Sequence, residues 1–229
     1  MIEFEGVGHR YGERVVLADV TLTLAEKRVG FVGANGSGKS TLARTVNGLV
    51  PPTSGRVRVD GLDPVRNGAA VRRRVGFVFT NPDSQIVMPT AGEDVAFSLR
   101  WRDGRRGSGS RAERARRAAE VLAENGLAGY ADHPAHQLSG GQKQLLALSG
   151  MLALDPDVLV CDEPTTLLDL RNARRFGELV RGLRQQVLIV THDLELLTDF
   201  DRVVVLDGGR VVADDEPGPA LRYYRSIAG

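Results

Sequence analysis

The segment GANGSGKS, from Gly33 to Ser40, has the residue types and the spacing of a phosphate-binding loop. Glycines let backbone N–H groups curl around phosphate oxygens, Lys39 can reach the terminal phosphates, and the hydroxyl of Ser40 can ligate Mg²⁺. The segment follows an apolar run, VGFVG, and precedes a predicted helix over 41–47. We therefore predict a nucleoside triphosphate site, whose loop residues are Gly33, Ala34, Asn35, Gly36, Ser37, Gly38, Lys39, Ser40 and Thr41.

Two acidic residues and a histidine follow two other apolar runs. Asp162 and Glu163 end the run VLVCDE, and His192 ends the run VLIVTH. Asp162 can hold Mg²⁺ through water, while Glu163 can polarise an attacking water molecule. Taken alone, such residues are more often surface acids and a structural histidine, and it is their combination with the phosphate-binding loop that favours a functional role. Because the carboxyl ends of parallel strands meet at one edge of a sheet, we expect Glu163 and His192 to lie together beside the loop.

A second glycine-rich segment, LSGGQ, covers residues 138–142. Ser139 and Gln142 fit a capping box that begins a helix with Leu145 and Leu148 on its apolar face. A glycine-rich helix N-terminus is also an anion-binding site, because its backbone N–H groups and its dipole attract negative charge. The segment therefore has two compatible interpretations, a capped helix start and a surface that contacts phosphate.

The composition is that of an ordinary globular chain. Its 229 residues include 30 Lys and Arg against 29 Asp and Glu, so the net charge of +1 predicts no overall attraction to nucleic acid. The one cysteine, Cys161, excludes an internal disulfide, and its apolar surroundings predict a buried position. No basic N-terminal region leads into an apolar stretch, so we expect neither a signal peptide nor a membrane span.

The apolar pattern predicts the elements that position these groups. Alternating apolar residues, which indicate half-buried antiparallel strands, are found near 2–4, 20–24 and 57–59. Runs that are apolar on both faces, as in a parallel sheet covered by helices, are found at 29–33, 75–79, 158–162 and 187–192. Helices are expected over 171–184, as a crossover between two of these strands, and near 219–226.

We predict an α/β fold in a single domain, 1–229. Its nucleotide-binding core, 1–91 and 155–229, has a mixed or parallel sheet and an N-terminal antiparallel β subdomain, and a helical subdomain covers 92–154. The segment DGRRGSGSR, 103–111, is expected to be a flexible loop. The arginine-rich stretch 100–117 fits a solvated helix face or a contact with anionic lipid head groups. Loop positions without a metal-binding role are expected for His9, His133 and His136.

The order and spacing of the phosphate-binding loop, Gln85, LSGGQ, VLVCDEP, LLD and His192 resemble the ATP-binding-cassette ATPases over essentially the whole chain. The resemblance implies an enzyme that hydrolyses ATP with Mg²⁺. It also implies that Tyr11 stacks on adenine and that Gln85 relays the movement of a partner. The implied catalytic residues are Glu163, His192 and Gln85, and the implied residues around Mg²⁺ are Ser40, Gln85 and Asp162.

In that family the LSGGQ signature closes on ATP held by a second ATPase subunit, so that two head-to-tail chains sandwich two ATP molecules. The resemblance implies that Asp169 is the D-loop aspartate and that four signature residues act in trans, namely Ser139, Gly140, Gly141 and Gln142. A complete set of motifs in this chain allows two competent sites in a homodimer. A related second ATPase as the partner stays open.

Residues 80–99, TNPDSQIVMPTAGEDVAFSL, look like the Q-loop and following helix of ATPases from energy-coupling-factor transporters, which take up vitamins and transition metals. In such systems this helix lines the groove that receives coupling helices of a transmembrane partner. The resemblance therefore implies an importer ATPase at the cytoplasmic face of the membrane. Its expected partners are integral membrane transporter subunits that contact the groove near 85–99, and no nucleic acid partner is expected.

The transported substrate is less well defined by the sequence. The short chain and the run DEPTTLLDLRNARR are similar to the ATPase of the biotin-specific branch, whereas cobalt and nickel ATPases share the Q-loop pattern. Thr80 stands where the group often has Gln, and Leu167 stands where a small residue is commoner. Biotin uptake is the expected function. Its alternatives are cobalt, nickel or another imported substrate and, in a different class, a soluble switch ATPase that acts on nucleic acid.

Overall fold

The computed structural model describes residues 1–100 and 110–228, and in them the strands form two sheets. A three-stranded antiparallel sheet has the order β2-β1-β4. Its strands are β1 (Ile2–Tyr11), β2 (Arg14–Leu24) and β4 (Ser54–Val59). Because alternate residues such as Phe4, Leu22 and Val57 are buried on one face, this sheet confirms the antiparallel strands predicted from the alternating pattern.

The second sheet has six strands in the order β5-β6-β7-β3-β8-β9, of which only β9 is antiparallel to its neighbour. The strands are β3 (Arg28–Val32), β5 (Val75–Val78), β6 (Val158–Asp162), β7 (Gln186–Val190), β8 (Arg202–Asp207) and β9 (Arg210–Asp215). Every residue of β3, β5 and β6 is buried, as the runs that are apolar on both faces predicted. The expected α/β fold is confirmed.

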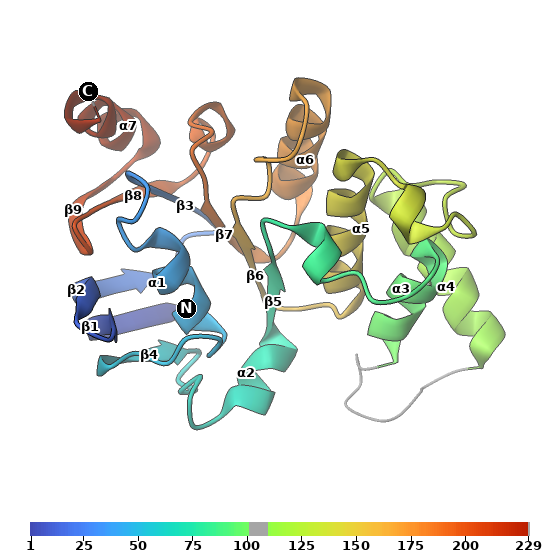
Figure 1. Cartoon of the computed structure of the whole chain (residues 1–229), viewed down its shortest axis with the longest axis horizontal. Coiled ribbons are helices and arrows are strands. Elements are labelled where there is room, and N and C mark those ends of the chain that lie inside the picture. Colours follow the sequence, from blue (N-terminus) through green and yellow to red (C-terminus); the bar gives the residue numbers. More distant parts are fainter. Residues whose placement is uncertain (101–109, 229) are drawn as a thin grey trace.

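Helices cover both faces of the six-stranded sheet and extend beyond one of its edges (Figure 1). The helices are α1 (Lys39–Val46), α2 (Gly68–Arg74), α3 (Ala91–Leu99), α4 (Arg111–Glu124), α5 (Gly140–Ala153), α6 (Leu170–Gly182) and α7 (Pro217–Ile227). On one face Phe31 and Val160 pack with residues of α1, and on the other Cys161 packs with Phe176 and Val180 of α6. The buried position predicted for Cys161 is confirmed.

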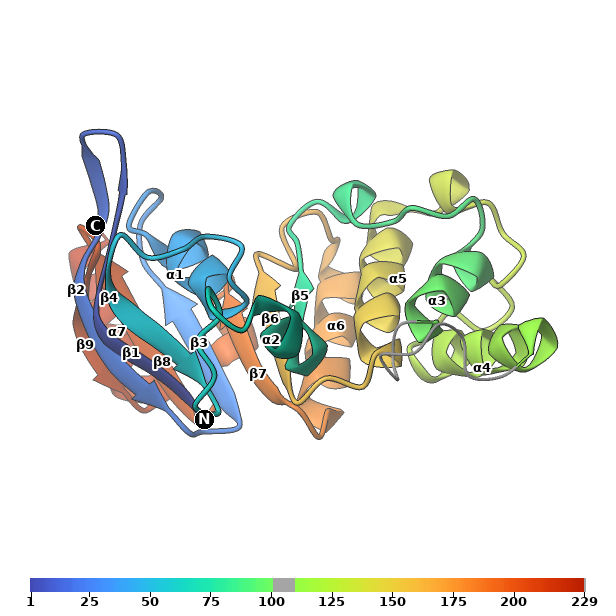
Figure 2. The ribbon, with the colours of Figure 1, turned by 90° about the horizontal axis from the view of Figure 1, so that it is seen from below.

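The molecule is elongated, with the three-stranded sheet at one end and α3, α4 and α5 grouped at the other (Figure 2). The phosphate-binding loop lies between β3 and α1, whereas the signature segment begins α5 in the helical group. α5 lies beside α6 and packs on edge strand β5. The two glycine-rich segments of this chain therefore belong to different parts of the fold.

Several local predictions need correction. His9 lies in β1 and is 6% exposed, where its Nδ1 is 3.0 Å from Pro51 O, so it is a buried strand residue and not a loop residue. His136 lies in a 3-10 helix over Ala135–Gln137 and not in a loop. A second short 3-10 helix follows His192, over Glu195–Leu197. The bulges in β1 and the short lengths of these helices give weak sequence periodicity, which explains the misses.

The arginine-rich region is described only in part. Residues 101–109, which contain most of the expected loop 103–111, lie outside the described residues. Ser110 is the N-cap of α4, with a capping box to Glu113, so the end of the expected loop is a helix start. On α4, Arg117 Nη1 lies 3.1 Å from a carboxylate oxygen of Glu120 and 3.1 Å from one of Glu124. Within the described part of the chain, no helix has the length and apolar character needed to cross a membrane.

Candidate functional site

The phosphate-binding loop has backbone conformations that glycine adopts readily. Gly36 and Gly38 have φ of 80° and 102°, and a Cβ atom on Gly33 would lie 2.1 Å from Leu206 O. The N-cap of α1 is Gly38, which provides no side-chain hydrogen bond. The first N–H groups of α1 are therefore uncapped by a side chain and available to an anion in the loop.

Lys39 folds back over this loop. Its Nζ donates hydrogen bonds to Gly33 O at 2.7 Å and to Ala34 O at 3.0 Å. Burial lowers the pKa of Lys39, and the negative charges of Glu163 and Asp162 oppose that shift. A buried cation with backbone acceptors and nearby carboxylates is held where a phosphate group would meet it.

An open pocket of about 520 Å³ surrounds the loop. It is lined by Tyr11, Arg14, Val16, Asn35, Gly36, Gly38, Lys39, Ser40, Thr41, Thr80, Glu163, Thr166 and His192. The pocket brings together the predicted aromatic residue, most of the predicted loop and the two predicted catalytic residues at the strand ends. Four of its residues were not assigned a role from the sequence, namely Arg14, Val16, Thr80 and Thr166.

Asp162 is the buried acid beside the loop. Its Oδ1 accepts a hydrogen bond of 2.7 Å from Ser40 Oγ, its Oδ2 lies 2.9 Å from Arg44 Nη2, and its backbone oxygen accepts a hydrogen bond of 2.8 Å from Thr80 Oγ1. A hydroxyl next to a carboxylate provides the oxygen donors that Mg²⁺ prefers, so Ser40 and Asp162 fit the implied metal. Ser40 would hold the ion and Asp162 would hold it through water, and the ion would neutralise charge on the phosphates.

Gln85, the third residue expected near Mg²⁺, lies outside this pocket. Its Oε1 accepts a hydrogen bond of 3.3 Å from Phe79 N, and its Nε2 is buried without a partner in the described residues. The amide therefore holds the start of the Q-loop against the end of β5. The structure brings Ser40 and Asp162 together through a hydrogen bond, whereas the hydrogen bond of Gln85 is with Phe79 N.

Glu163 and His192 form a contact at the carboxyl edge of the six-stranded sheet. Glu163 Oε1 lies 3.0 Å from His192 Nε2, and Glu163 Oε2 accepts a hydrogen bond of 3.3 Å from His192 N. Glu163 has φ of 51°. This left-handed backbone conformation is uncommon for residues other than glycine, and such residues cluster at functional sites. Burial raises the pKa of Glu163, opposed by the charges of His192 and Lys39, which suits a carboxylate that takes a proton from water.

The signature segment forms the capping box expected from its sequence. Ser139 Oγ accepts a hydrogen bond of 3.3 Å from Gln142 N, and Ser139 N donates one of 2.8 Å to Gln142 Oε1. A Cβ atom on Gly141 would lie 2.7 Å from Cγ of Asn172, so glycine permits the close packing of α5 on α6. Asp169 is the N-cap of α6 and accepts a hydrogen bond of 2.8 Å from Asn172 N. The signature residues and Asp169 are absent from the lining of the pocket around the loop.

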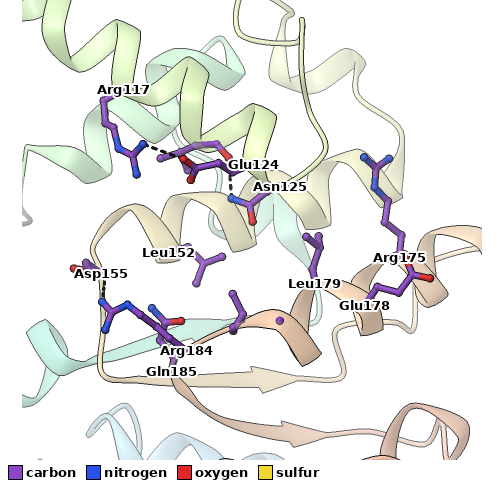
Figure 3. Close-up of a pocket in the computed structure, with 13 residues that line it drawn as sticks. Arg117, Glu124, Asn125, Leu152, Asp155, Arg175, Glu178, Leu179, Arg184 and Gln185 are labelled. Atoms are coloured by element: carbon purple, nitrogen blue, oxygen red, sulfur yellow. Dashed lines mark hydrogen bonds and ion pairs between the residues drawn. The ribbon is translucent and has the colours of Figure 1, made fainter.

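Another hollow, of about 640 Å³, lies between α4, α5 and α6 and contains none of the predicted site residues (Figure 3). Its arginines contact groups of the protein itself. Arg117 pairs with Glu124, Arg184 pairs with Asp155, and Arg175 donates to a backbone oxygen at 2.9 Å. Among the described residues, the predicted site residues gather around the phosphate-binding loop and not in this hollow.

Comparison with known proteins agrees with the geometry. The family model described as ABC transporter matches residues 17–166. The chain is 53% identical, over 98% of its length and 97% of the relative's, to a protein of Deinococcus radiodurans provisionally named an ABC transporter ATP-binding protein. It is 44% identical, over 99% of both chains, to the biotin transport ATP-binding protein BioM of Rhizobium etli.

Two further relatives have other names. The cobalt import ATP-binding protein CbiO of Syntrophus aciditrophicus is 42% identical over 95% of this chain and 79% of its own length. The energy-coupling factor transporter ATP-binding protein EcfA1 of Ligilactobacillus salivarius is 36% identical over 95% of this chain and 78% of its own length. A bacterial ABC transporter cassette whose solved structure is dimeric superposes with a TM-score of 0.83 and 32% identity, over 95% of this chain and 99% of that one.

The family match covers more than half of the chain, and the relatives extend it to nearly the whole length. The geometry at the phosphate-binding loop fits the same family. The chain therefore belongs to the ABC transporter family, within its energy-coupling-factor group, as an enzyme that binds ATP with Mg²⁺ and couples its hydrolysis to transport.

Proposed function

We propose that this ATPase hydrolyses ATP at composite sites between two copies of the chain and drives biotin uptake through integral membrane subunits at the cytoplasmic face of the membrane. The observation that carries the proposal is the pocket in which Lys39, Ser40, Glu163 and His192 meet. Within it Tyr11 stacks on adenine, and the loop residues hold the phosphates. We also propose that the chain divides into a nucleotide-binding core, 1–91 and 155–229, and a helical subdomain, 92–154, because α3, α4 and α5 are grouped at one end of the molecule.

Glu163 and His192 act on the water that attacks the terminal phosphate. Glu163 accepts a proton from that water, and His192, 3.0 Å away, orients the carboxylate and contacts the phosphate. Lys39 and the N-terminus of α1 stabilise the negative charge that the phosphate group carries. The raised pKa of Glu163 supports this assignment, because a more basic carboxylate removes a proton more effectively.

The second copy supplies the signature residues. Ser139 and Gly140 do not line the pocket of their own chain, so they are available to the ATP of a partner. Next to them Leu167 and Leu170 are 56% and 79% exposed, and a Cβ atom on Gly140 would lie 3.3 Å from Leu167 O. Large exposed apolar side chains beside a glycine-rich helix start support a protein contact at this surface, and a solved relative is dimeric.

The membrane partner contacts a hollow of about 350 Å³ beside the Q-loop. It is lined by Asp83, Ile86, Val87, Met88, Pro89, Ala135 and His136. Val87 is 63% exposed, which provides an apolar contact for a helix of the partner. Asp94 fixes this edge, since its Oδ1 accepts hydrogen bonds from Val87 N at 2.8 Å and from Met88 N at 3.0 Å.

Two contacts connect the Q-loop and the residue at the end of β5 to the signature helix α5. Lys143 Nζ lies 2.7 Å from Asp83 Oδ1, and Gln144 Nε2 donates a hydrogen bond of 3.2 Å to Phe79 O. Both α5 residues directly follow the signature segment. A displacement of the Q-loop by the partner therefore reaches the helix that contacts the second ATP.

Biotin is the proposed substrate because the relative that covers 99% of this chain at 44% identity is named for biotin transport. Cobalt or nickel uptake is the second candidate, supported by a cobalt import relative at 42% identity. The test is uptake of labelled biotin and of radioactive cobalt by cells that express this chain with the membrane subunits of a biotin importer or of a cobalt importer. Uptake of biotin that Glu163→Gln abolishes is expected.

Cobalt uptake without biotin uptake would replace the substrate and leave the ATPase assignment intact. A chain that co-purifies with nucleic acid and with no integral membrane protein would contradict the transporter role. The full-length chain in detergent-solubilised membranes is the material for that measurement, and Glu163→Gln serves as the control for dependence on hydrolysis.

A further inference from the structure

Arg14 is a cation in the ATP pocket that none of the sequence motifs includes. It begins β2, directly after the turn Gly12-Glu13, and its register partner across the hairpin is Tyr11. Directly opposite residues of an antiparallel pair project on the same face of the sheet. Arg14 therefore emerges beside Tyr11, the proposed adenine contact, and both side chains line the pocket.

The guanidinium of Arg14 lies against the phosphate-binding loop. A Cβ atom on Gly36 would lie 3.2 Å from Arg14 Nη2, so the charged end of the side chain reaches the turn of the loop. Gly36 has φ of 80°, in the stretch where the backbone curls around the phosphate position. The hairpin thus places a second positive charge beside the phosphate-binding loop, in addition to that of Lys39.

This charge is not neutralised by the protein. Across residues 1–100 and 110–228, no hydrogen bond or ion pair engages Arg14. The nearest acid in sequence, Glu13, is engaged elsewhere, since its Oε2 lies 3.5 Å from Arg10 Nη2. An unpaired guanidinium at the mouth of a phosphate pocket has five donors that fit phosphate oxygens in a bidentate way.

We propose that Arg14 is a further phosphate-binding residue, which closes on the phosphate chain of ATP from the hairpin while Tyr11 contacts the base. The inference rests on the proposed function, because it takes ATP to be bound at this loop. It assigns one face of the β1–β2 hairpin two tasks, recognition of the base by an aromatic ring and recognition of the phosphates by a guanidinium. Arg14 then favours ATP and ADP over AMP, since its contribution depends on the number of phosphate charges.

The test measures dissociation constants of ATP, ADP and AMP for the full-length chain with Mg²⁺, by competition against a fluorescent ATP analogue. Arg14→Ala is expected to weaken ATP and ADP binding about tenfold and AMP binding by less than about twofold, in line with loss of a charge-assisted hydrogen bond. Arg14→Lys should recover part of the loss, because it keeps the charge without the bidentate geometry. Thermal unfolding of each variant shows that the hairpin remains folded.

Arg10→Ala is the matched control, because it removes an arginine of the same hairpin that pairs with Glu13 and does not line the pocket. It should bind all three nucleotides like the unaltered chain. Equal losses of ATP and AMP for Arg14→Ala, or no loss at all, would overturn the proposal. Lys39→Ala distinguishes a failure of the proposed ATP site from a failure of the role of Arg14. If it abolishes ATP binding while Arg14→Ala does not weaken it, the proposed function stands and only the role of Arg14 fails; if the unaltered chain binds no ATP, both fail.

Discussion

The two helices of this chain that begin in a glycine-rich segment, α1 and α5, differ in how their first backbone N–H groups are capped. At α1 the N-cap Gly38 offers no side-chain hydrogen bond, whereas at α5 a capping box between Ser139 and Gln142 satisfies backbone N–H groups. Around α1 the same chain supplies a cation, a carboxylate and a histidine, whereas the signature residues at the start of α5 do not line that pocket. We propose that similar local chemistry serves catalysis at α1 and contact with a second chain at α5.

The largest expected effect belongs to the pocket around α1, for which this chain supplies Glu163 and His192. Glu163→Gln should lower ATP hydrolysis about 10²- to 10⁴-fold, since it removes the group that accepts the proton, while ATP binding is retained. The variant should also accumulate as a nucleotide-bound dimer, which gel filtration with ATP detects. Phosphate release and nucleotide binding are measured on the same sample. Unchanged turnover would remove Glu163 from the catalytic role.

Residues at the strand ends were predictable from the sequence because the information is local. A buried apolar run followed by Asp162 and Glu163, or by His192, indicates both the strand and the chemistry at its end. The three-stranded sheet followed from alternation in the same way. These features depend on neighbours in sequence, and the structure reproduces the strand ends side by side.

The positions of other residues in the site depend on contacts between elements that are distant in the sequence, and the sequence pattern does not specify these contacts. Thr80 reaches the backbone of Asp162 only because β5 and β6 are adjacent, and Arg14 reaches the loop only because the hairpin folds over it. His9 was expected in a loop because bulges interrupt the alternation of β1. Local patterns define elements, whereas the contacts between elements decide which side chains share a pocket.

Mixed dimers test whether the signature segment at the start of α5 acts on ATP held by the other chain. In a dimer that pairs Ser139→Ala with Lys39→Ala, both changes fall on one composite site and the other stays intact, so roughly half of the ATPase activity of the unaltered dimer should remain. The matched control places both changes in one chain and pairs it with an unaltered chain, so that each site has one defect and little activity remains. Differently tagged chains purified in sequence provide both dimers. Equal activities of the two arrangements would show that the signature does not act in trans.

A smaller effect is expected at Asp94, which supports the segment between the Q-loop and α3. Asp94→Ala leaves Val87 N and Met88 N without their acceptor and should lower the free energy of unfolding by roughly 1–3 kcal/mol, whereas Asp94→Asn keeps an acceptor oxygen and should lose less. Urea unfolding measures both variants. A stability loss as large for Asp94→Asn as for Asp94→Ala would show that the carboxylate charge, rather than the acceptor, matters.

The same carboxylate predicts a pH dependence. Burial raises the pKa of Asp94, opposed by its two backbone hydrogen bonds, so the folded state binds the proton more tightly than the unfolded state. The contribution of Asp94 to stability is therefore most favourable below its unfolded pKa of about 4 and decreases as pH rises through the raised folded value. Relative to Asp94→Asn, the unaltered chain should lose stability over that window and then show a constant difference. An opposite slope would contradict the assigned direction.

The smallest effect on stability is expected at the ion pair that connects the Q-loop to α5. Because Asp83 is largely exposed, Lys143→Asp or Asp83→Lys alone should change the free energy of unfolding by about 0.2–1 kcal/mol, yet each should lower substrate uptake per ATP hydrolysed. Exchange of both residues restores opposite charges and should restore coupling. Uptake and phosphate release are measured together in proteoliposomes that contain the membrane subunits.

The exposed pair of Arg58 and Glu5, 2.8 Å apart on the three-stranded sheet, provides the matched control for this exchange. Its single and double charge reversals should change stability by a similar amount and leave coupling unchanged, since the pair lies away from the Q-loop and the signature helix. If the exchanged Asp83–Lys143 pair couples as poorly as the single variants, the ion pair does not carry the movement. The link between the Q-loop and the signature helix would then depend on Gln144 and on the packing of α5 against β5, α3 and the 3-10 helix Pro82–Ser84.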